Sequence, residues 1–486
     1  MSDDLRGRTA ELTADLSTPG GGAHTARRQP GAPDATRRHE NRTLLVAASG
    51  TFLALALFTT PFGSLAEVAA VLGAGAGGQT WMLSSMSVGL TSGLLITGAL
   101  ADDFGRRRMF VAGTAVIAAA CVLGVLVASA PLFILGRVGQ GLGAAAVVSC
   151  SLGLIGHTFP SGAKRVRASG LWGAAVGAGI AFGPVLAALA NAELGWRWPY
   201  LLLAVLAGGV ALAARLLLPE SVSGSPRRVD LPGALLLGSG TVALLAGLVT
   251  GRGGWTRPAT VVLLGTGLVV LGAFVLVELR TERRDRDPLL ALGLLRRPDF
   301  AAVTVAGVAT GLGVIAAMSY APIVLERGLH TSTLTGALAI VIWSGVSVPV
   351  ALAARRLKID GDAQLAAGLL LVTVGLSLLT ALHVGDGPGR LVPGLVVAGI
   401  GSGVLNAALG RQAVASVPPE RAGMGSGVNN TARYLGSAIG VTIVSVIATH
   451  AEPAALIAGW NAAVLVTAAF SALGAGVVLL LRARRP

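Results

Sequence analysis

The sequence predicts an all-α polytopic membrane protein with about 14 transmembrane helices, arranged as two six-helix bundles plus a two-helix insert. Hydrophobic residues make up 53% of the 486 residues and charged residues only 12%. This is too few charges to cover the surface of a soluble protein of this length. Apolar runs of about 20 residues recur along the chain, and a run of that length crosses the hydrocarbon core of a bilayer as one helix.

The expected spans follow one another with short connections between them. Two charged linkers, Pro219–Arg228 after the sixth span and Arg280–Pro298 after the eighth, divide them into groups. The predicted domains are a disordered cytoplasmic tail at 1–43, an N-terminal six-helix bundle at 44–218, a two-helix insert at 229–279, a cytoplasmic linker at 280–299 and a C-terminal six-helix bundle at 300–482. The individual spans are expected at 44–66, 80–101, 109–129, 132–156, 169–191, 198–218, 231–250, 259–279, 300–325, 334–354, 364–383, 391–413, 425–449 and 456–481.

The distribution of positive charge along the chain indicates its topology in the membrane. If the N-terminus is cytoplasmic and the spans alternate, most of the excess charge of +14 falls in cytoplasmic loops and tails. The outer loops receive only Arg197, Arg252, Arg257, Arg327 and Arg390. This is the positive-inside bias, so we expect both termini in the cytoplasm and no nucleic-acid partner.

A glycine-rich stretch in the fifth span suggests helices that move against each other. Gly170, Gly179, Gly183 and Pro184 lie in an uncharged run that ends at Ala188. Glycine and proline weaken a helix in water, but in a membrane bundle small residues allow close approach of neighbouring helices. A smooth glycine face with a Gly-Pro bend predicts a transporter whose helices rock along a dry seam.

The loop after the second span combines a turn residue with opposite charges. Gly105 permits a tight turn, and Asp102 stands at a helix end within reach of Arg106. The pair could latch one conformation at the cytoplasmic rim. The alternative is an ordinary solvated loop, and we interpret Arg107 and Arg108 in that way, as topology signals only.

Two arginines lie inside apolar spans. A charge there costs about 2.5–3.5 kcal/mol on insertion scales, so Arg137 needs backbone carbonyls or cavity water as partners, and Gln140, one turn on, can face the same space. The alternative for Arg137 is snorkelling to the outer interface. Asn429, Asn430 and Arg433 fall at helical spacing and are expected to line a cavity, with hydrogen bonding between helices as the alternative.

These motifs together resemble the major facilitator superfamily, in its fourteen-spanner drug:proton antiporter branch (multidrug or antibiotic efflux). The resemblance covers nearly all of 44–482 and rests on Gly98–Arg108, Arg137–Ala145, the Gly170–Pro184 spacing, Trp196–Trp198, Asp230–Trp255 and Gly427–Gly436. It implies the major facilitator fold and proton-coupled export by alternating access. It also implies that Asp102 and Arg106 form a latch, and that Arg137 affects proton transfer.

The chain departs from that branch in its acidic residues. Leu57 stands where the first helix usually has an acid, Met86 where the second has an aromatic hydroxyl, and Leu203 where the sixth has asparagine. Every Asp and Glu lies away from the middle of the spans, which leaves Glu67 as the candidate for carrying the coupling proton; its alternative is a wetted outer-rim residue. A buried cation without a counter-charge is costly, so we expect a neutral or anionic amphipathic substrate.

No other chemistry is indicated. The sequence has no phosphate-binding loop, no zinc-protease motif and no nucleophile elbow, so we expect no enzyme activity, no catalytic residue, no metal and no cofactor other than the proton gradient. The expected function is export of a drug, antibiotic or secreted metabolite from a bacterial plasma membrane by a monomer. An importer or uniporter, a lipid-modifying membrane enzyme and a receptor remain as alternatives.

Overall fold

The computed structural model describes residues 32–159, 162–220, 230–251, 253–283, 288–290, 292–354, 359–418, 422–448 and 452–484. The chain divides into two compact units, Met1–His39 and Glu40–Pro486. Most of the predicted tail, 1–31, lies outside the described residues. The first helix starts at Ala32, within the range expected to be disordered.

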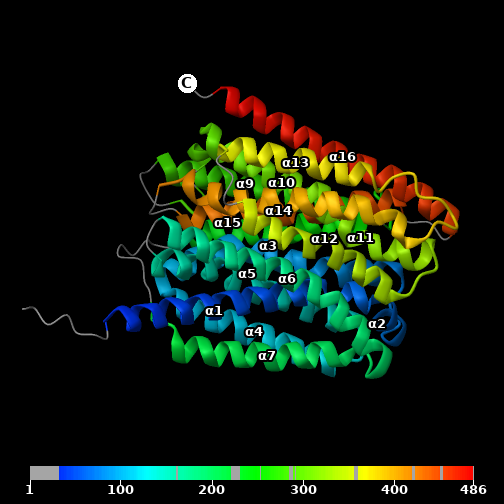
Figure 1. Ribbon diagram of the computed structural model, residues 1–486, viewed down its shortest axis with the longest axis horizontal. Coiled ribbons are helices and arrows are strands. Elements are labelled where there is room, and N and C mark those ends of the chain that lie inside the picture. The colour runs from blue at the N-terminus through cyan, green and yellow to red at the C-terminus, as the bar shows by residue number, and fades with distance from the viewer. Residues whose placement is uncertain are drawn as a thin grey trace, which may run out of the picture. The chain divides into compact units, whose positions relative to one another are not determined.

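The described residues form helices and connecting turns, without strands. Figure 1 shows α1 and α4–α7 on one side of the bundle, with α10, α13, α14 and α16 on the other. We call α1–α7 the front group and α10–α16 the rear group. The elements are α1 (Ala32–Thr59), η1 (Thr60–Gly63), α2 (Leu65–Val71), α3 (Ala76–Phe104), α4 (Arg106–Leu126), α5 (Ala130–Thr158), α6 (Ala163–Glu193), α7 (Arg197–Leu217), α8 (Leu231–Gly251), α9 (Pro258–Arg283), η2 (Leu292–Arg296), α10 (Pro298–Thr310), η3 (Gly311–Ile315), α11 (Ala316–Ile323), η4 (Val324–Gly328), α12 (Thr333–Ala354), α13 (Gly361–Ser377), η5 (Pro388–Leu391), α14 (Val392–Ala415), α15 (Ala422–Ala448) and α16 (Pro453–Ala483).

The helices follow the expected spans closely, with two informative differences. The span expected at 300–325 is interrupted by π-helical turns at η3 and η4; such turns are found frequently at functional sites. The span expected at 364–383 ends at Ser377. The residues after it form a loop that Asn461 holds, because its side chain accepts the N–H of Leu382 at 3.1 Å and donates to the carbonyl of Leu382 at 2.9 Å.

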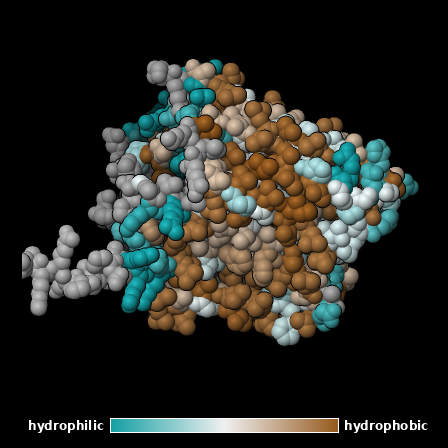
Figure 2. Space-filling view, viewed as in Figure 1, coloured by the Kyte–Doolittle hydropathy of each residue, from teal (hydrophilic) through white to brown (hydrophobic). Residues whose placement is uncertain are grey.

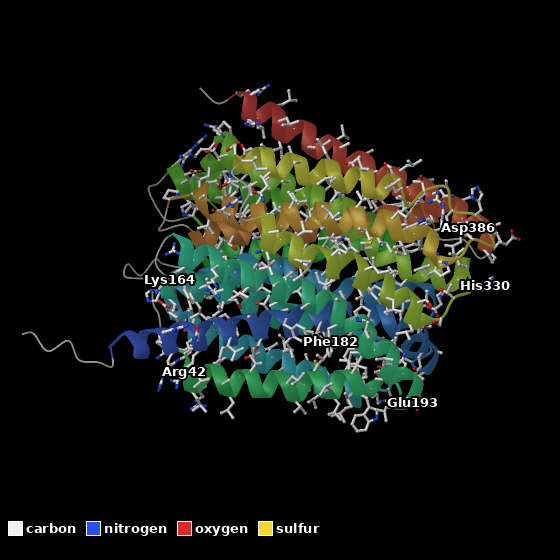
Figure 3. All side chains as sticks on the ribbon, viewed as in Figure 1. Arg42, Lys164, Phe182, Glu193, His330 and Asp386 are labelled. Atoms are coloured by element: carbon white, nitrogen blue, oxygen red, sulfur yellow. The ribbon has the colours of Figure 1, made fainter. Side chains whose placement is uncertain are left out.

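The surface is that of a membrane protein. Within the described residues, 12 helical segments are long and apolar enough to cross a bilayer. Figure 2 shows a hydrophobic band across the molecule with hydrophilic residues gathered at its two ends. Arg42 and Lys164 lie at one end of the helices, whereas Glu193, His330 and Asp386 lie at the other (Figure 3). We call these the inner end and the outer end, after the sides on which the sequence analysis expects them.

The front and rear groups meet along two main contacts. Between α6 and α12, the Ser344 hydroxyl donates to the carbonyl of Gly177 at 2.7 Å, and both residues are buried. Between α3 and α15, a Cβ added at Gly427 would lie 2.9 Å from Leu95. Helix α8 of the predicted insert covers the second contact, where Leu245 packs with Val88 and Ala438.

Candidate transport cavity and gating residues

A cavity of about 490 Å³ opens between the front and rear groups at the outer end. The front group lines it with η1, the starts of α2 and α3 and the end of α6, and the rear group with α11, η4, the start of α12 and part of α15. Its ionisable residues, among those described, are Glu67, Glu326, Arg327 and Tyr320. The Arg327 guanidinium donates to the side-chain oxygen of Gln79 at 3.3 Å, which joins the two groups across the cavity mouth.

A smaller cavity of about 30 Å³ lies next to the first, because Phe62 and Ser319 line both. Its lining is mainly aromatic and aliphatic, with two hydroxyl side chains, Thr59 and Ser319, and one charged side chain, that of Arg433. Phe58, Trp343 and Tyr434 supply the other aromatic walls, and Leu55, Thr59, Ile180, Ile315, Met318 and Ile340 complete it. Residues from both groups therefore surround the Arg433 side chain.

Arg137 is held by the carbonyl end of α1. Its side chain is fully buried, and one terminal nitrogen donates to the Leu57 carbonyl at 2.8 Å and to the Gln140 Oε1 at 2.9 Å, while the other donates to the Phe58 carbonyl at 3.3 Å. The Leu57 carbonyl would normally accept the N–H of residue 61, but that residue is proline and has none. Arg137 replaces the missing donor, and the negative end of the α1 dipole favours a cation there.

Backbone carbonyls were one of the two kinds of partner expected for Arg137, and Gln140 faces the same space as expected. Gln140 is also buried, and its amide donates to the Cys121 sulfur at 3.6 Å. Neither residue is among the described side chains that line the two cavities. Snorkelling does not describe Arg137 either, because its carbonyl partners lie within the protein.

Asn429, Asn430 and Arg433 on α15 have different neighbours. The Asn429 amide donates to the Val303 carbonyl on α10 at 2.9 Å, and that of Asn430 to the Ser426 carbonyl one turn back at 3.1 Å. Asn429 thus matches the interhelical alternative. Of the three, Arg433 alone is among the residues that line a cavity. Sequence spacing could not separate these roles, since it fixes a helix face but not its neighbour.

Glu67 lies at the rim of the outer cavity, on α2. Its carboxylate accepts the N–H of Trp196 at 3.4 Å and is half-buried. Glu67 thus has both the access to water and the position beside the cavity that a proton-carrying residue would need. A water-exposed rim residue without a role in coupling would have the same geometry. Only transport measurements on a Glu67 variant distinguish the two interpretations.

The turn between α3 and α4 is built around Glu220, which the sequence analysis missed. Gly105 has φ of +101°, a conformation that favours glycine, and the Glu220 carboxylate lies against it where a Cβ would be. Glu220 accepts the N–H of Arg107 at 3.1 Å, and its Oε2 lies 3.4 Å from the Arg107 Nε and 3.5 Å from the Arg108 Nε. The interpretation of Arg107 and Arg108 as topology signals alone is thus incomplete.

The Arg106 side chain extends from this turn to α5. Its terminal nitrogen donates to the Gly153 carbonyl at 3.4 Å, and Gly153 leaves room for the guanidinium. The side chain of Asp102, its expected partner, lies outside the described residues. The contacts described for Arg106 and Arg107 hold the turn on the front group, and the latch stays a prediction.

We expect Glu220→Gln to lower transport about two- to fivefold, because loss of a half-exposed ion pair is worth about 0.5–1 kcal/mol. The neutral amide keeps an acceptor for the Arg107 N–H but loses both guanidinium pairings. Transport per protein molecule in membrane vesicles measures the effect. Asp360→Asn is the matched control, because Asp360 pairs with Arg482 at 3.1 Å on an exposed surface; equal losses in both variants would show that the turn has no special role.

The glycines of α6 divide between two neighbours. A Cβ at Gly179 would lie 2.4 Å from the Phe52 carbonyl, and one at Gly183 would lie 2.1 Å from the Ala56 carbonyl. Both therefore pack against α1, inside the front group. Gly177 faces α12 of the rear group. Gly170 is half-buried, and Pro184 is buried within α6, where its carbonyl closely approaches Gly63.

A second acidic residue, Glu278, has a structural role that the sequence did not predict. Glu278, expected near a cytoplasmic helix end, is fully buried at the inner part of α9. Its Oε2 accepts the N–H of Leu290 at 3.1 Å, and Glu282, one turn on, accepts that of Gly293 at 3.3 Å. The two carboxylates fasten the linker that leads to α10 along the end of α9. Nothing in the sequence indicates that Glu278 and Glu282 accept hydrogen bonds from the backbone of this linker.

A helical bundle with an apolar belt, and with a cavity between two groups of helices, has the architecture of a membrane transporter. The chain matches the family model for the Major Facilitator Superfamily over residues 47–441. The human organic anion transporter MFSD10 has a similar fold, with a TM-score of 0.63 at 19% sequence identity over 90% of this chain and 99% of that one.

Two bacterial proteins are among the relatives in sequence. The puromycin resistance protein pur8 of Streptomyces alboniger is 32% identical over 85% of this chain and 81% of its own length. The probable actinorhodin transporter of Streptomyces coelicolor is 34% identical over 82% of this chain and 72% of its own length. This chain belongs to the major facilitator superfamily. It is a membrane transporter rather than an enzyme, and the resemblance noted from its motifs is confirmed.

Proposed function

We propose that this protein is a proton-coupled exporter of amphipathic small molecules that works by alternating access in a bacterial plasma membrane. It crosses the bilayer 14 times, as two six-helix bundles with a two-helix insert, and both termini are cytoplasmic. The carrying observation is the cavity of about 490 Å³ at the outer end, which front and rear groups line together. Such a shared cavity changes its access when the two groups rock.

The proposed cargo is a drug, antibiotic or secreted metabolite that is neutral or anionic. Support comes from relatives described as a puromycin resistance protein and a probable actinorhodin transporter. The inner cavity adds a second argument, because its one charged lining residue among those described is the cation of Arg433. A cationic substrate there would meet repulsion without a counter-charge.

The direct test uses inverted membrane vesicles with a pH-sensitive dye inside. When an acidic-inside gradient is established, addition of a transported compound should drive protons out of the vesicle lumen. Vesicles without the protein give the baseline. Uptake of the compound that is independent of the gradient would instead favour a uniporter.

We expect Glu67→Gln to flatten the pH dependence of transport, because an amide cannot carry the coupling proton. The readout is the transport rate over a series of external pH values in the vesicle assay. Glu326→Gln is the matched control, since Glu326 lines the same cavity from the rear group. An unchanged pH profile in Glu67→Gln would assign the residue to the wetted rim.

A further inference from the structure

Arg433 presents the one charged side chain, among the described residues, to a cavity that is mainly aliphatic and aromatic. It lies on α15 and lines the inner cavity together with Trp343, Tyr434 and Phe62. Arg137, the other arginine inside an apolar helix, is enclosed instead by the carbonyl end of α1. The two residues therefore have different surroundings, and only Arg433 is placed to meet a molecule in the cavity.

The described partners of Arg433 orient it but leave its charge unbalanced. One terminal nitrogen lies 3.5 Å from the Asn406 side-chain oxygen, and the other donates to the Tyr434 hydroxyl at 3.2 Å. Its guanidinium carbon stands 5.1 Å from the Tyr434 ring centre, and its Nε is buried without a hydrogen-bond partner. Among the described residues no carboxylate pairs with it or lines this cavity. A half-buried cation without a carboxylate partner is stabilised by a bound anion.

The aromatic side chains around the inner cavity are held in fixed orientations. Phe58 makes edge-to-face contacts with Tyr434 at 5.9 Å and with Phe62 at 6.5 Å between ring centres. The Trp343 indole N–H donates to the Ser402 hydroxyl at 2.9 Å, which fixes the orientation of its ring. Fixed aromatic side chains bind planar molecules with little loss of conformational entropy.

The two cavities together have room for such a molecule. The inner cavity of about 30 Å³ holds no more than a small charged group, whereas the outer cavity of about 490 Å³ can hold a ring system. Phe62 and Ser319 line both and mark where the molecule would pass from one to the other.

We propose that Arg433 is the anion-binding residue of the substrate site and that the substrate class is the flat aromatic acids. The carboxylate, sulfonate or phenolate of the substrate pairs with the Arg433 guanidinium in the inner cavity, and its rings lie in the outer cavity beside Phe62 and Tyr320. This inference rests on the proposed export function, which it narrows from amphipathic molecules in general to aromatic anions.

A matched pair of fluorescent probes tests the proposal by binding alone. Anilinonaphthalene sulfonate carries an anionic group, and phenylnaphthylamine has the same rings without the sulfonate. The dissociation constants of both are measured on the purified full-length protein in lipid nanodiscs, with the signal of protein-free nanodiscs subtracted. We expect the wild type to bind the sulfonate at least about tenfold more tightly than the neutral probe, as a charge-assisted pair implies.

Three variants separate Arg433 from general electrostatics. Arg433→Gln should bind both probes with similar affinity, and Arg433→Lys should keep part of the preference for the sulfonate. Arg390→Gln removes an equal charge from the exposed surface outside both cavities and should keep the wild-type preference. Size-exclusion profiles of all variants in nanodiscs establish that each is folded.

The outcomes distinguish this inference from the proposed function. Equal binding of the two probes by the wild type, absence of sulfonate binding, or an unchanged preference in Arg433→Gln would each overturn the inference. The proposed function fails on a different result, namely vesicles in which no tested compound releases protons. Selective binding without proton release would leave Arg433 as an anion site and refute proton-coupled export.

Discussion

Gly183→Leu is expected to abolish transport, with less than about a tenth of the wild-type rate remaining. Even the first carbon of the new side chain would lie 2.1 Å from the Ala56 carbonyl and 2.4 Å from the Thr59 hydroxyl. Backbone cannot yield as a flexible side chain does, so α1 and α6 must separate. The separation also breaks the hydrogen bond from Thr59 to the Ile180 carbonyl, now 3.1 Å long. Since small residues are what allow such close helix packing, the loss should be large.

Transport of a proton-releasing compound in inverted vesicles, divided by the amount of protein in the membrane, measures this loss. Gly173→Leu is the matched control, because nothing lies within 4 Å of the position that its Cβ would take. It should insert and transport nearly as the wild type does. Near-normal transport by Gly183→Leu, or an equal loss in Gly173→Leu, would show that close packing of α6 on α1 is not required.

Arg137→Met is expected to destabilise the protein and to reduce transport more than about tenfold. Methionine fits the space but leaves the Leu57 and Phe58 carbonyls without their donor, and each unsatisfied buried group costs about 1–3 kcal/mol. The end of α1 that these carbonyls belong to also carries Phe58, a wall of the inner cavity. Loss of the donor therefore disturbs the cavity as well as the fold.

Thermal unfolding of the detergent-purified variant, followed by size-exclusion chromatography after heating, measures the first effect, and vesicle transport the second. Leu135→Ala on the same helix is the control, because Leu135 is exposed on the surface of the bundle. A thermal midpoint of Arg137→Met equal to that of the wild type would mean that the carbonyl end of α1 needs no cation.

The helices could be predicted from sequence because length and apolarity decide whether a segment spans a bilayer. The described helices follow the expected ranges, and the main difference is the early end of α13; in the loop after it, Leu382 exchanges two hydrogen bonds with Asn461, which lies far along the chain. The carbonyl site of Arg137 was partly readable, since Pro61 removes a donor near the end of the first span. Gln140, expected to face the same space as Arg137, completes that site.

Residue partners between helices could not be predicted. The sequence places Gly177, Gly179 and Gly183 on one helix but does not say that two of them face α1 and one faces α12. Glu220 follows α7 by only a few residues and gives no sign that it lies under the turn at Gly105. Asn429 and Arg433 share a helix face by spacing, yet one bonds to α10 and the other reaches the cavity. Such choices depend on packing between distant segments.

The central claim is that the front and rear groups rock about their shared seam. Distances between spin labels test this claim in a variant without the two buried cysteines, Cys121 and Cys150. One labelled pair, Val71 and Val384, spans the two groups at the outer end, and another, Leu216 and Ile359, spans them at the inner end; all four residues are exposed.

The measurement is the pair of distance distributions before and after acidification in lipid nanodiscs. Alternating access predicts that the outer distance shortens while the inner distance lengthens, because closing one end of the seam opens the other. Two distances that stay fixed, or that change in the same direction, would contradict the account.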